Sequence, residues 1–443
     1  MMEVSRFDIP LRVSAARIRE IADASEGEFT LLYTKPTELR WVAYGLERMI
    51  QVARTTGAAM VYADHFSSVD GVEAPAPVID CQSGALRDDF DFGGVQLYRT
   101  EALRKAAEGL GNWQYAGLYD LRLSVARVGE LVHINEFLYY EVEFDTRKSG
   151  EKLFDYVDPR NRAVQIEMEQ VCTRHLKAIG GWLPPVFRDV RLSEGNFPVE
   201  ASVVIPCRNR VRTIGDAISS ALSQECPFPF NVIVVDDNSS DGTVDVIRSF
   251  HDDRLVYIAQ DPSWHAIGGN WNSAIFSDKC GRFALQLDSD DVYSGTDTVR
   301  KFVEAFYEQN CAMVVGTYRI TDFNLNELPP GVIDHREWTE ENGRNNALRI
   351  NGLGAPRGFL TRLLRETGGF PTVKYGEDYA VALRISREYR IGRIYDVMYN
   401  CRRWDDNSDA ALDIEKVNAN NLYKDRIRSW ELKARIAMTK NLQ

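Results

Sequence analysis

The feature that most constrains this chain is the segment FALQLDSDD at residues 283–291. A short apolar run there ends in three carboxylates, Asp288, Asp290 and Asp291. As a buried strand, the run would deliver this charge to its carboxyl end, where open α/β sheets bind ligands. Clustered carboxylates are costly without a cation, and hard oxygen ligands suit Mg²⁺ or Mn²⁺. The segment predicts a metal–diphosphate site; the alternative is an acidic turn in which Asp291 or Ser289 caps the next helix.

Composition is that of a soluble globular protein with room for two or three domains. The net charge of −12 argues against a general nucleic-acid-binding surface, so no nucleic-acid partner is expected. The seven cysteines are widely spaced without a CxxC pair, which favours reduced thiols over a disulfide framework. The start of the chain lacks an apolar signal core, and no stretch approaches the ~18 apolar residues of a membrane span. We therefore expect a cytoplasmic protein.

From residue 201 the pattern alternates between strand and helix. Apolar runs at 201–205, 232–235, 255–258 and 283–287 are separated by segments with helical spacing. This alternation predicts an α/β fold, a Rossmann-like, mostly parallel sheet flanked by helices with right-handed crossovers. The loop after the first strand reads PCRNR, so the glycine fingerprint of NAD and FAD sites is absent.

Two further acids, Asp236 and Asp237, follow the second strand of this pattern. Carboxylates at a strand end can accept hydrogen bonds from a nucleotide base or from ribose hydroxyls. The local alternative is an Asx turn and helix N-cap made by Asp237, Asn238 and Ser240. Both readings can hold with different residues in each role.

Four motifs in this order, IPCRNR, VIVVDDNSSDGT, GGNWNSAI and LQLDSDD, resemble the nucleotide half of glycosyltransferase family 2, with the glycosyltransferase A fold. Downstream, GAPRGFLTRLLRETGGF and YGEDYAVALRI are similar to the family's acceptor half, so the resemblance covers residues 199–410. It implies that Asp288 and Asp290 hold a divalent metal, Mn²⁺ or Mg²⁺, with the donor diphosphate. It implies Asp378, or its neighbour Glu377, as general base. The residues it implies in nucleotide-sugar binding are Pro206, Arg208, Asp236, Asp237, Asn272, Asp288, Ser289, Asp290 and Arg403.

Two points qualify this resemblance. Glu377 and Asp378 precede a helical run, so they would also complement a helix dipole, worth ~0.3–1 kcal/mol. Many family members carry a histidine near the domain end, but residues 400–410 read NCRRWDDNSDA. Arg402 or Arg403 would then contact the diphosphate, and Trp404 would stack on a sugar or pack in the core.

The reaction that the resemblance implies is inverting, metal-dependent transfer of a sugar from a nucleoside diphosphate, UDP being favoured, to a hydroxyl of a glycan or lipid-linked glycan. One alternative is a sugar-phosphate nucleotidylyltransferase, which would show a glycine-rich phosphate loop after the first strand. Another is a non-catalytic carbohydrate-binding scaffold. Retention of acids at both 288–291 and 377–378 argues against the scaffold.

The first half of the chain echoes the second without its acids. EFTLLYTKPT aligns with RFALQLDSDD at an offset of 254 residues (Phe29 to Phe283), as does Val78-Ile79-Asp80 with Val332-Ile333-Asp334. A later block aligns at an offset of 260 residues, at which Tyr139 matches Tyr399. No counterpart of segment 201–281 is apparent in the first half. Residues 1–155 are therefore interpreted as a degenerate, non-catalytic half-domain, the alternative being shared α/β patterning without common descent.

The remaining segments complete the predicted organisation. Residues 156–200 are expected to form a helix and an extended linker, 201–410 the catalytic domain, and 411–443 an amphipathic, locally basic helix. The predicted apolar face of that helix carries Tyr423, Ile427, Trp430, Ala434 and Ala437. Such a face either packs on its own domain or allows peripheral contact with anionic lipid.

Overall fold

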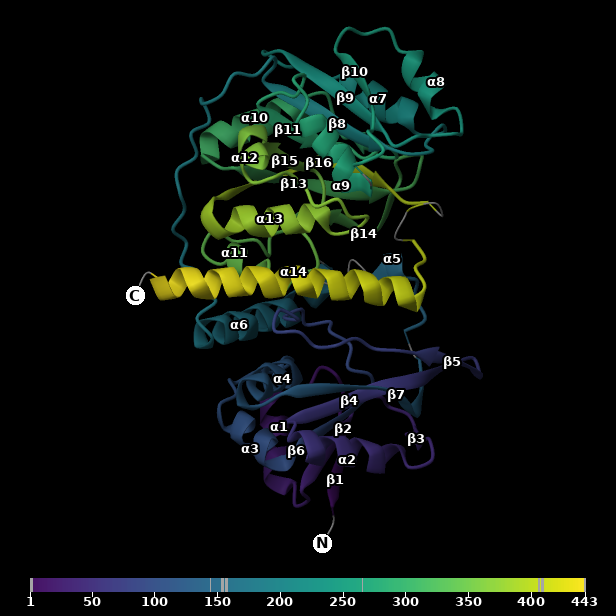
Figure 1. Cartoon of the computed structure of the whole chain (residues 1–443), viewed down its shortest axis with the longest axis vertical. Coiled ribbons are helices and arrows are strands. Elements are labelled where there is room, and N and C mark those ends of the chain that lie inside the picture. Colours follow the sequence, from purple (N-terminus) through teal and green to yellow (C-terminus); the bar gives the residue numbers. More distant parts are fainter. Residues whose placement is uncertain are drawn as a thin grey trace. The chain divides into compact units, whose positions relative to one another are not determined.

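The computed structural model describes residues 3–143, 145–152, 155, 158–264, 266–404, 407 and 410–441. The chain forms two compact units, each built on one β-sheet with helices packed against it (Figure 1). Unit 1 comprises Met1–Leu183, Leu348–Asn351 and Ser408–Gln443, and unit 2 comprises Pro184–Ala347 and Gly352–Asn407. In the part of the chain that is described, no helix has the length and apolar character needed to cross a membrane.

Unit 2 contains the segment that resembles a catalytic domain. Its elements are β8 (Ala201–Cys207), α7 (Ile214–Leu222), β9 (Phe230–Asp236), α8 (Thr243–Arg248), β10 (Leu255–Ala259), α9 (Ala266–Ile275), β11 (Phe283–Gln286), β12 (Val292–Tyr293), α10 (Thr298–Gln309), β13 (Met313–Thr321), β14 (Glu327–Ile333), α11 (Gly343–Asn346), β15 (Arg357–Leu360), α12 (Thr361–Glu366), α13 (Glu377–Glu388) and β16 (Ile391–Arg402).

Among the described residues of unit 2, these strands form one sheet in the order β10-β9-β8-β11-β15-β13-β16-β12, with β14 paired to β13. Strands β10, β9, β8 and β11 are mutually parallel, and β8, β9 and β11 are buried along their whole length, as expected for strands covered on both faces. Strand β15 then runs antiparallel to both β11 and β13. The predicted α/β fold is confirmed, with a parallel nucleotide half and a mixed second half.

Unit 1 is also an α/β unit. Its elements are β1 (Val4–Asp8), α1 (Ala15–Ala24), β2 (Phe29–Tyr33), β3 (Arg40–Trp41), α2 (Gly45–Thr56), β4 (Met60–Val69), β5 (Val72–Ala76), β6 (Val95–Arg99), α3 (Thr100–Glu108), α4 (Gly117–Val128), β7 (Leu131–Val142), α5 (Ser149–Lys152), a short 3₁₀ turn (Pro159–Asn161), α6 (Arg162–Ala178) and α14 (Ile414–Asn441).

Two apolar clusters, one on each face, hold the unit 1 sheet between helices. On one face α1, α3 and α4 pack on the sheet through Ile18, Leu103 and Leu121, beside Leu32. On the other face α2 packs through Met49, Ile50 and Ala53 against Phe29, Leu31 and Val61 (Figure 1). Alternation along β2 sends successive side chains to opposite faces, so one strand serves both clusters.

The two sheets share one strand order. Unit 1 reads β1-β2-β6-β4-β7-β3 where unit 2 reads β8-β11-β15-β13-β16-β12, and β5 pairs with β4 as β14 pairs with β13. Each corresponding pair has the same direction: the first and fourth are parallel and the others antiparallel.

The register of these pairings also agrees residue by residue. Met60 lies opposite Leu131 and His65 opposite Tyr139 in unit 1, while Met313 lies opposite Ile391 and Tyr318 opposite Tyr399 in unit 2. Both strand pairs are interrupted by two register shifts at corresponding places. Irregularities of this kind are conserved within families, so their repetition is stronger evidence of kinship than shared strand order.

Two details of the predicted alignment are wrong. Segment 201–281 does have partial counterparts, because β1 pairs with β2 as β8 pairs with β11, and α1 connects them as α9 precedes β11. What unit 1 omits is the segment equivalent to α7, β9, α8 and β10. In the hairpins, Ala76 rather than Ile79 corresponds to Ile333, since His65 lies opposite Ala76 and Tyr318 opposite Ile333.

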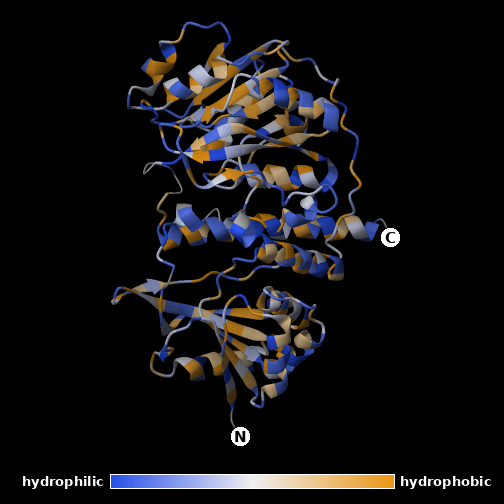
Figure 2. Cartoon of the chain, turned by 180° about the vertical axis from the view of Figure 1, so that it is seen from behind, coloured by the Kyte–Doolittle hydropathy of each residue, from blue (hydrophilic) through white to orange (hydrophobic). Residues whose placement is uncertain are grey.

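Helix α14 packs within unit 1 through polar as well as apolar side chains, and Figure 2 shows much hydrophilic colour along it. The Gly84 amide donates to Ser429 Oγ at 2.9 Å, and a β-carbon on Gly84 would lie 2.1 Å from the Ser429 nitrogen. The fully buried Arg428 bonds Asp425 at 2.9 Å. The predicted apolar face is wrong, because Ile427 is buried whereas Trp430 is 60% exposed. Buried charges are tolerated here because they are paired.

Candidate active site

The loops that follow β8 and β9 lie against each other at the carboxyl ends of these strands. The Asn209 amide donates to Ser239 Oγ at 2.8 Å, and the Arg210 amide donates to Thr243 Oγ1 at 2.7 Å. Asn209 adopts a left-handed conformation with φ of 52°, which asparagine tolerates better than most residues. The two loops predicted to hold the nucleoside therefore form one hydrogen-bonded wall.

Asp236 and Asp237 have different environments in this wall. Asp236 is 3% exposed, and its carboxylate accepts from the amide three residues further on. Asp237 accepts from the Arg208 guanidinium at 3.3 Å; the Arg208 side chain is 65% exposed and that of Asp237 17% exposed. The N-cap residue of α8 is Gly242, and Asp241 just before it accepts from the Thr243 amide at 3.0 Å, so the cap predicted for Asp237 and its neighbours is wrong. Asp237 is thus partly buried and paired with Arg208.

Asp288 follows β11 directly and is held from two sides. Both of its carboxylate oxygens accept from Gln286 Nε2, at 3.0 and 3.1 Å, and its amide donates to Tyr399 Oη at 3.1 Å. Burial raises the pKa of Asp288, the Gln286 bond opposes this rise, and the charge of Asp290 adds to it.

Three donor groups lie close to the Asp290 carboxylate. The Trp404 indole N–H donates to its carboxylate at 3.2 Å, the Asn407 amide at 3.3 Å, and the Arg210 guanidinium approaches to 3.9 Å. Trp404 is therefore not a core residue: it is half-buried, meets the acidic turn through its N–H, and has the Arg212 guanidinium 5.3 Å from its ring centroid. An indole over a carboxylate closes one side of the site.

Ser289 and Asp291 are both buried, at 7% and 5% exposure. Asp291 accepts from the Arg402 amide at 2.7 Å, and burial, followed by the charges of Asp290 and Asp288, raises its pKa well above the ordinary value. The next helix, α10, begins at Thr298 with Asp297 as its N-cap residue. The alternative in which this turn caps a helix is therefore wrong.

The acidic turn fits a divalent cation. Across the described ranges, no set of three or more His, Cys, Asp and Glu side chains is arranged to hold a metal. Asp288 and Asp290 would supply two carboxylate ligands, leaving diphosphate and water oxygens for the remainder of an octahedral shell. Burial, and after it the charge of neighbouring aspartates, raises the pKa values of Asp288 and Asp291, and a bound cation would offset both effects.

The second acidic pair, Glu377 and Asp378, begins α13 after Gly376, which has φ of 78°. Glu377 is 7% exposed, and burial, followed by the charge of Asp378, raises its pKa to about 8. Asp378 is ion-paired with Arg357 and has a side chain 24% exposed. The raised pKa favours the protonated form of Glu377, and Asp378 is the more exposed of the two carboxyl groups.

A continuous line of contacts joins the two acidic groups. Gln286 Oε1 accepts from Arg357 Nε at 3.0 Å while its Nε2 donates to Asp288, and Arg357 Nη1 pairs with Asp378. A guanidinium has no acceptor, so the orientation of the Gln286 amide is set by its partners. We call this line, Asp288–Gln286–Arg357–Asp378, the carboxylate bridge.

Two predicted contact residues are engaged in the scaffold. Asn272 uses its amide nitrogen and oxygen on the backbone of Phe370, at 2.8 Å each, and is 4% exposed. It clamps α9 to the loop between α12 and α13. Pro206 does not end its strand, as was predicted, but lies inside β8 opposite Val235.

The arginines of residues 400–410 divide their roles. Arg402 lies beneath the acidic turn: its Nε donates to the Asp290 carbonyl at 2.5 Å, and its guanidinium pairs with Asp216 at 2.8 Å. The Arg403 amide donates to the Thr321 carbonyl at 2.8 Å. The structure therefore places the Arg402 side chain against the acidic turn, and the diphosphate contact predicted for Arg403 stays a prediction.

Sequence reasoning missed Arg210, Gln286 and Arg357, for which only one signal was available. A glutamine inside the apolar run FALQL needs a buried partner, so its presence announces a polar contact. Nothing in the sequence said that the partner would be Arg357, 71 positions away.

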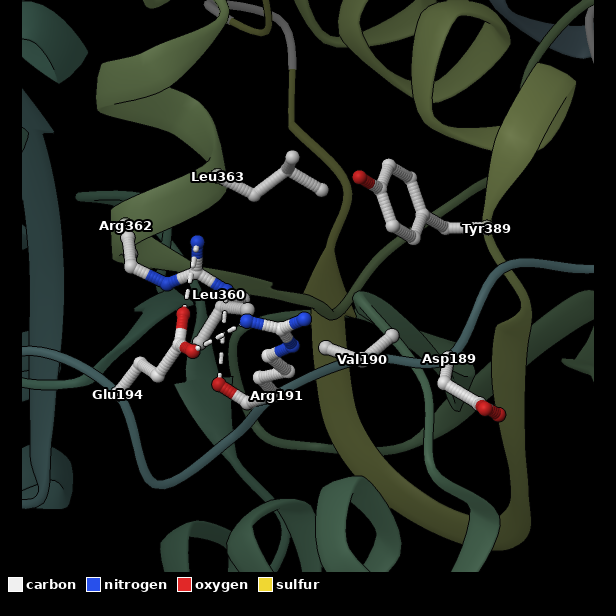
Figure 3. Close-up of a pocket in the computed structure, with 8 residues that line it drawn as sticks. All are labelled: Asp189, Val190, Arg191, Glu194, Leu360, Arg362, Leu363 and Tyr389. Carbon is white, nitrogen blue, oxygen red and sulfur yellow. Dashed lines mark hydrogen bonds and ion pairs between the residues drawn. The ribbon is translucent and has the colours of Figure 1, made fainter.

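A cavity of about 160 Å³ lies at the opposite end of β15 from the acids (Figure 3). It is lined by the linker that precedes β8 and by α12, with Arg362 and Glu194 3.6 Å apart at its edge. Leu360 lines it and pairs with Phe283, at the far end of β11 from Asp288. The cavity is therefore separate from the acidic site.

Unit 2 is thus an α/β domain with carboxylates at and after the carboxyl ends of β9 and β11. Residues 202–363 match the model of the family described as Glycosyl transferase family 2, and this part of the chain is a glycosyltransferase family 2 domain. The protein is thus a glycosyltransferase. This assignment removes the nucleotidylyltransferase alternative.

The chain is also similar to curated proteins and to a solved structure. The chain is 26% identical over 231 residues, 52% of its length and 84% of the relative's, to the Escherichia coli UDP-Glc:alpha-D-GlcNAc-diphosphoundecaprenol beta-1,3-glucosyltransferase WfgD. It is 31% identical to the putative teichuronic acid biosynthesis glycosyltransferase TuaG of Bacillus subtilis, over 28% of this chain and 49% of that one. S. aureus TarS 1-349 in complex with UDP-GlcNAc shares 19% identity, with a TM-score of 0.41, over 53% of this chain and 71% of that chain.

Proposed function

We propose that the protein transfers one sugar from a UDP-sugar to a hydroxyl of a lipid-linked glycan, with inversion at the anomeric carbon. The observation that carries this proposal is the acidic edge, where a turn with Asp288 and Asp290 is joined by the carboxylate bridge to Asp378. One end suits a cation and a diphosphate, and the other suits an acceptor hydroxyl.

The proposed division of labour follows from the contacts. Asp288 and Asp290 hold the divalent ion, which when bound neutralises charge on the departing diphosphate. Arg210 and the Trp404 indole N–H, both directed at Asp290, flank that diphosphate. Asp378 takes the proton of the acceptor hydroxyl. Because base and leaving group occupy opposite ends of the bridge, attack from the base side inverts the sugar carbon.

The donor and acceptor classes come from the named relatives. The match covers 84% of the length of the E. coli relative, which uses UDP-Glc and an acceptor carried on diphosphoundecaprenol. By analogy, this chain takes a UDP-hexose and a lipid diphosphate-linked glycan. The ion pair of Asp237 and Arg208, which follows the carboxyl ends of β9 and β8, is proposed to meet the uridine.

The test is transfer with a panel of UDP-, GDP- and dTDP-sugars and a synthetic lipid diphosphate-linked sugar, with Mn²⁺ and after chelation. We expect UDP-sugars to be consumed only with metal and to give a product of inverted anomeric configuration by NMR. Activity that survives chelation would remove the metal role. Activity with GDP-sugars only would remove the donor assignment.

We also propose that unit 1 is a degenerate, non-catalytic copy of the acceptor half of unit 2. At the place of Asp288, Ser289 and Asp290 it has Thr34, Lys35 and Pro36. This place is closed by the buried Glu141 carboxylate, which lies 3.1 Å from Lys35 and 3.0 Å from His65. Titration should therefore find one UDP and one Mn²⁺ site per chain; two of each would contradict the proposal.

Peripheral membrane contact is proposed for the exposed side of α14. Arg426, Trp430, Lys433 and Lys440 are all exposed at helical spacing, and within the described residues no ion pair is recorded for the three cations. Each cation near an anionic lipid surface contributes about 1 kcal/mol, and tryptophan favours the interface. Co-sedimentation with anionic but not neutral vesicles is expected for the unmodified chain, and about tenfold less for Lys433→Glu. Negligible binding to both vesicles would end this proposal.

A further inference from the structure

The two middle members of the carboxylate bridge, Gln286 and Arg357, are largely shielded from solvent. Gln286 is 4% exposed and the Arg357 side chain 14% exposed, so both are shielded parts of the site. The antiparallel register of β11 and β15 places Leu285 opposite Gly358, so the next residues along, Gln286 and Arg357, adjoin across the two strands. Strand pairing therefore fixes this contact independently of any ligand.

The chemistry of the two side chains suits a link rather than a simple charge. A guanidinium presents several donors in a rigid fork, so Arg357 can bond Gln286 through Nε and Asp378 through Nη1 at once. Lysine, a point charge with a flexible stem, could satisfy only one of these reliably. Gln286 in turn passes the constraint on, because its Nε2 spans both oxygens of Asp288.

Unit 1 gives an internal comparison. At the four positions of the bridge it carries Leu32, Thr34, Gln96 and Leu118, so every member is replaced. Gln96 accepts from the Tyr98 hydroxyl at 2.7 Å instead. Framework residues of the same strands persist, with Phe29 matching Phe283 and Tyr139 matching Tyr399. The bridge therefore disappears together with the acids, although the strands that would carry it remain.

We propose that Arg357 is a positioning residue that acts at both ends of the site: through Gln286 it orients Asp288 for the divalent ion, and directly it aims Asp378 at the acceptor hydroxyl. This inference rests on the proposed function. It assigns Arg357 and Gln286 roles beyond those of the metal ligands and the base.

Loss of Arg357 is expected to weaken metal binding, the opposite of what its charge alone would do. A guanidinium near a cation site repels the cation, so loss of its charge would tighten metal binding if charge were its only effect. If Arg357 instead holds Gln286 against Asp288, its loss frees the amide and weakens metal binding. Outer-shell partners of this kind typically cost about 10–100-fold in metal affinity or activity when they are removed.

The experiment measures Mn²⁺ affinity by the electron paramagnetic resonance signal of the free ion, and kcat and KM at saturating Mn²⁺, for the full chain and four variants. Arg357→Gln is expected to bind Mn²⁺ about tenfold more weakly and to lose kcat about 10–100-fold, with donor KM within about threefold. Gln286→Leu, which has the residue of the unit 1 position, is expected to weaken Mn²⁺ about 10–100-fold. Arg357→Lys should recover only part of either loss.

The double variant decides whether the residues act together. If the bridge is one device, Arg357→Gln with Gln286→Leu should weaken Mn²⁺ no more than the worse single change, because groups that act as a unit are non-additive. Arg300→Gln, which removes an exposed pair with Glu304, is the matched control and should change nothing. Thermal melting checks that each variant folds.

Tighter or unchanged Mn²⁺ binding in Arg357→Gln, full recovery in Arg357→Lys, or multiplying losses in the double variant would overturn the bridge while leaving the proposed function intact. Absence of Mn²⁺ binding by the unmodified chain would overturn both. The Gln286→Leu measurement keeps the inference testable even if the arginine variant is unstable, because it leaves Arg357 in place.

Discussion

The two sheets of this chain share a strand order and register, but the turn after one pair of corresponding strands is acidic in unit 2 and carries a lysine in unit 1. In unit 2 the turn after β11 concentrates Asp288, Asp290 and Asp291, two of which have raised pKa values. In unit 1 the turn after β2 carries Lys35, which neutralises the buried Glu141. The difference teaches that the framework does not require the acids. Clustered carboxylates without a cationic side chain are expected where the site binds a cation.

The largest effect is expected for loss of Asp290, the carboxylate that accepts from Trp404 and Asn407. Asp290→Ala should lower transfer roughly 10⁴-fold, about 5 kcal/mol, because several kcal/mol of charge stabilisation in the transition state depend on the metal. The matched control is Pro36→Ala at the corresponding turn of unit 1. Activity is measured as UDP release, and thermal melting checks that both variants fold. Loss of activity in both folded variants would contradict the conclusion that only the unit 2 turn is catalytic.

Next in size is the base. Asp378→Asn should lower kcat about 10³-fold, within the range usual for general bases, without a comparable change in donor KM. Glu377→Gln is its matched control, since a Glu377 that keeps its proton cannot serve as base at neutral pH, and it should retain activity within about fivefold. The reverse ranking of the two variants in steady-state kinetics would transfer the role to Glu377.

In unit 1 the corresponding experiment changes stability rather than rate. Glu141→Gln leaves Lys35 and His65 without their shared carboxylate and should cost about 2–3 kcal/mol, less than for a fully buried pair because Lys35 is 20% exposed. Urea unfolding measures this loss, and Glu20→Gln, which breaks an exposed pair with Arg17, should stay within about 0.5 kcal/mol. UDP and Mn²⁺ affinity should be unchanged below the unfolding transition; a loss of either would mean that unit 1 takes part in binding.

The smallest effect is a pH dependence of stability. Glu377 has a pKa of about 8 in the folded chain, above its ordinary value, so the folded state holds the proton more tightly than the unfolded state. Stability from this group is therefore lost as pH rises towards 8 and levels off above it. Between pH 7 and pH 9 the unmodified chain should lose about 1.4 kcal/mol relative to Glu377→Gln. Parallel stability curves for the two proteins would remove the raised pKa.

Local patterns predicted much of the site because strand ends can be read from sequence. An apolar run followed by carboxylates located Asp288 and Asp290, and a second run located Asp236 and Asp237. The proposed repeat was visible as two similar offsets, 254 residues from Phe29 to Phe283 and 260 residues from Tyr139 to Tyr399, at buried strand positions with the same residues. Asn272 was predicted to bind the nucleotide sugar, and Trp404 was left open between a sugar contact and the core. A tryptophan or an asparagine can serve either a core or a site, and only its neighbours decide.

The sequence by itself determined the α/β alternation, the two acidic stations and the absence of those acids from the first half. These are properties of short segments, in which hydrophobic periodicity and residue type are sufficient. Only the tertiary structure decided that Gln286 meets Arg357, that the Arg402 side chain underlies the acidic turn, and that Lys35, His65 and Glu141 close the equivalent place in unit 1. Each of these contacts joins different strands or the turns at their ends, and strand register, which no single segment encodes, sets which side chains meet.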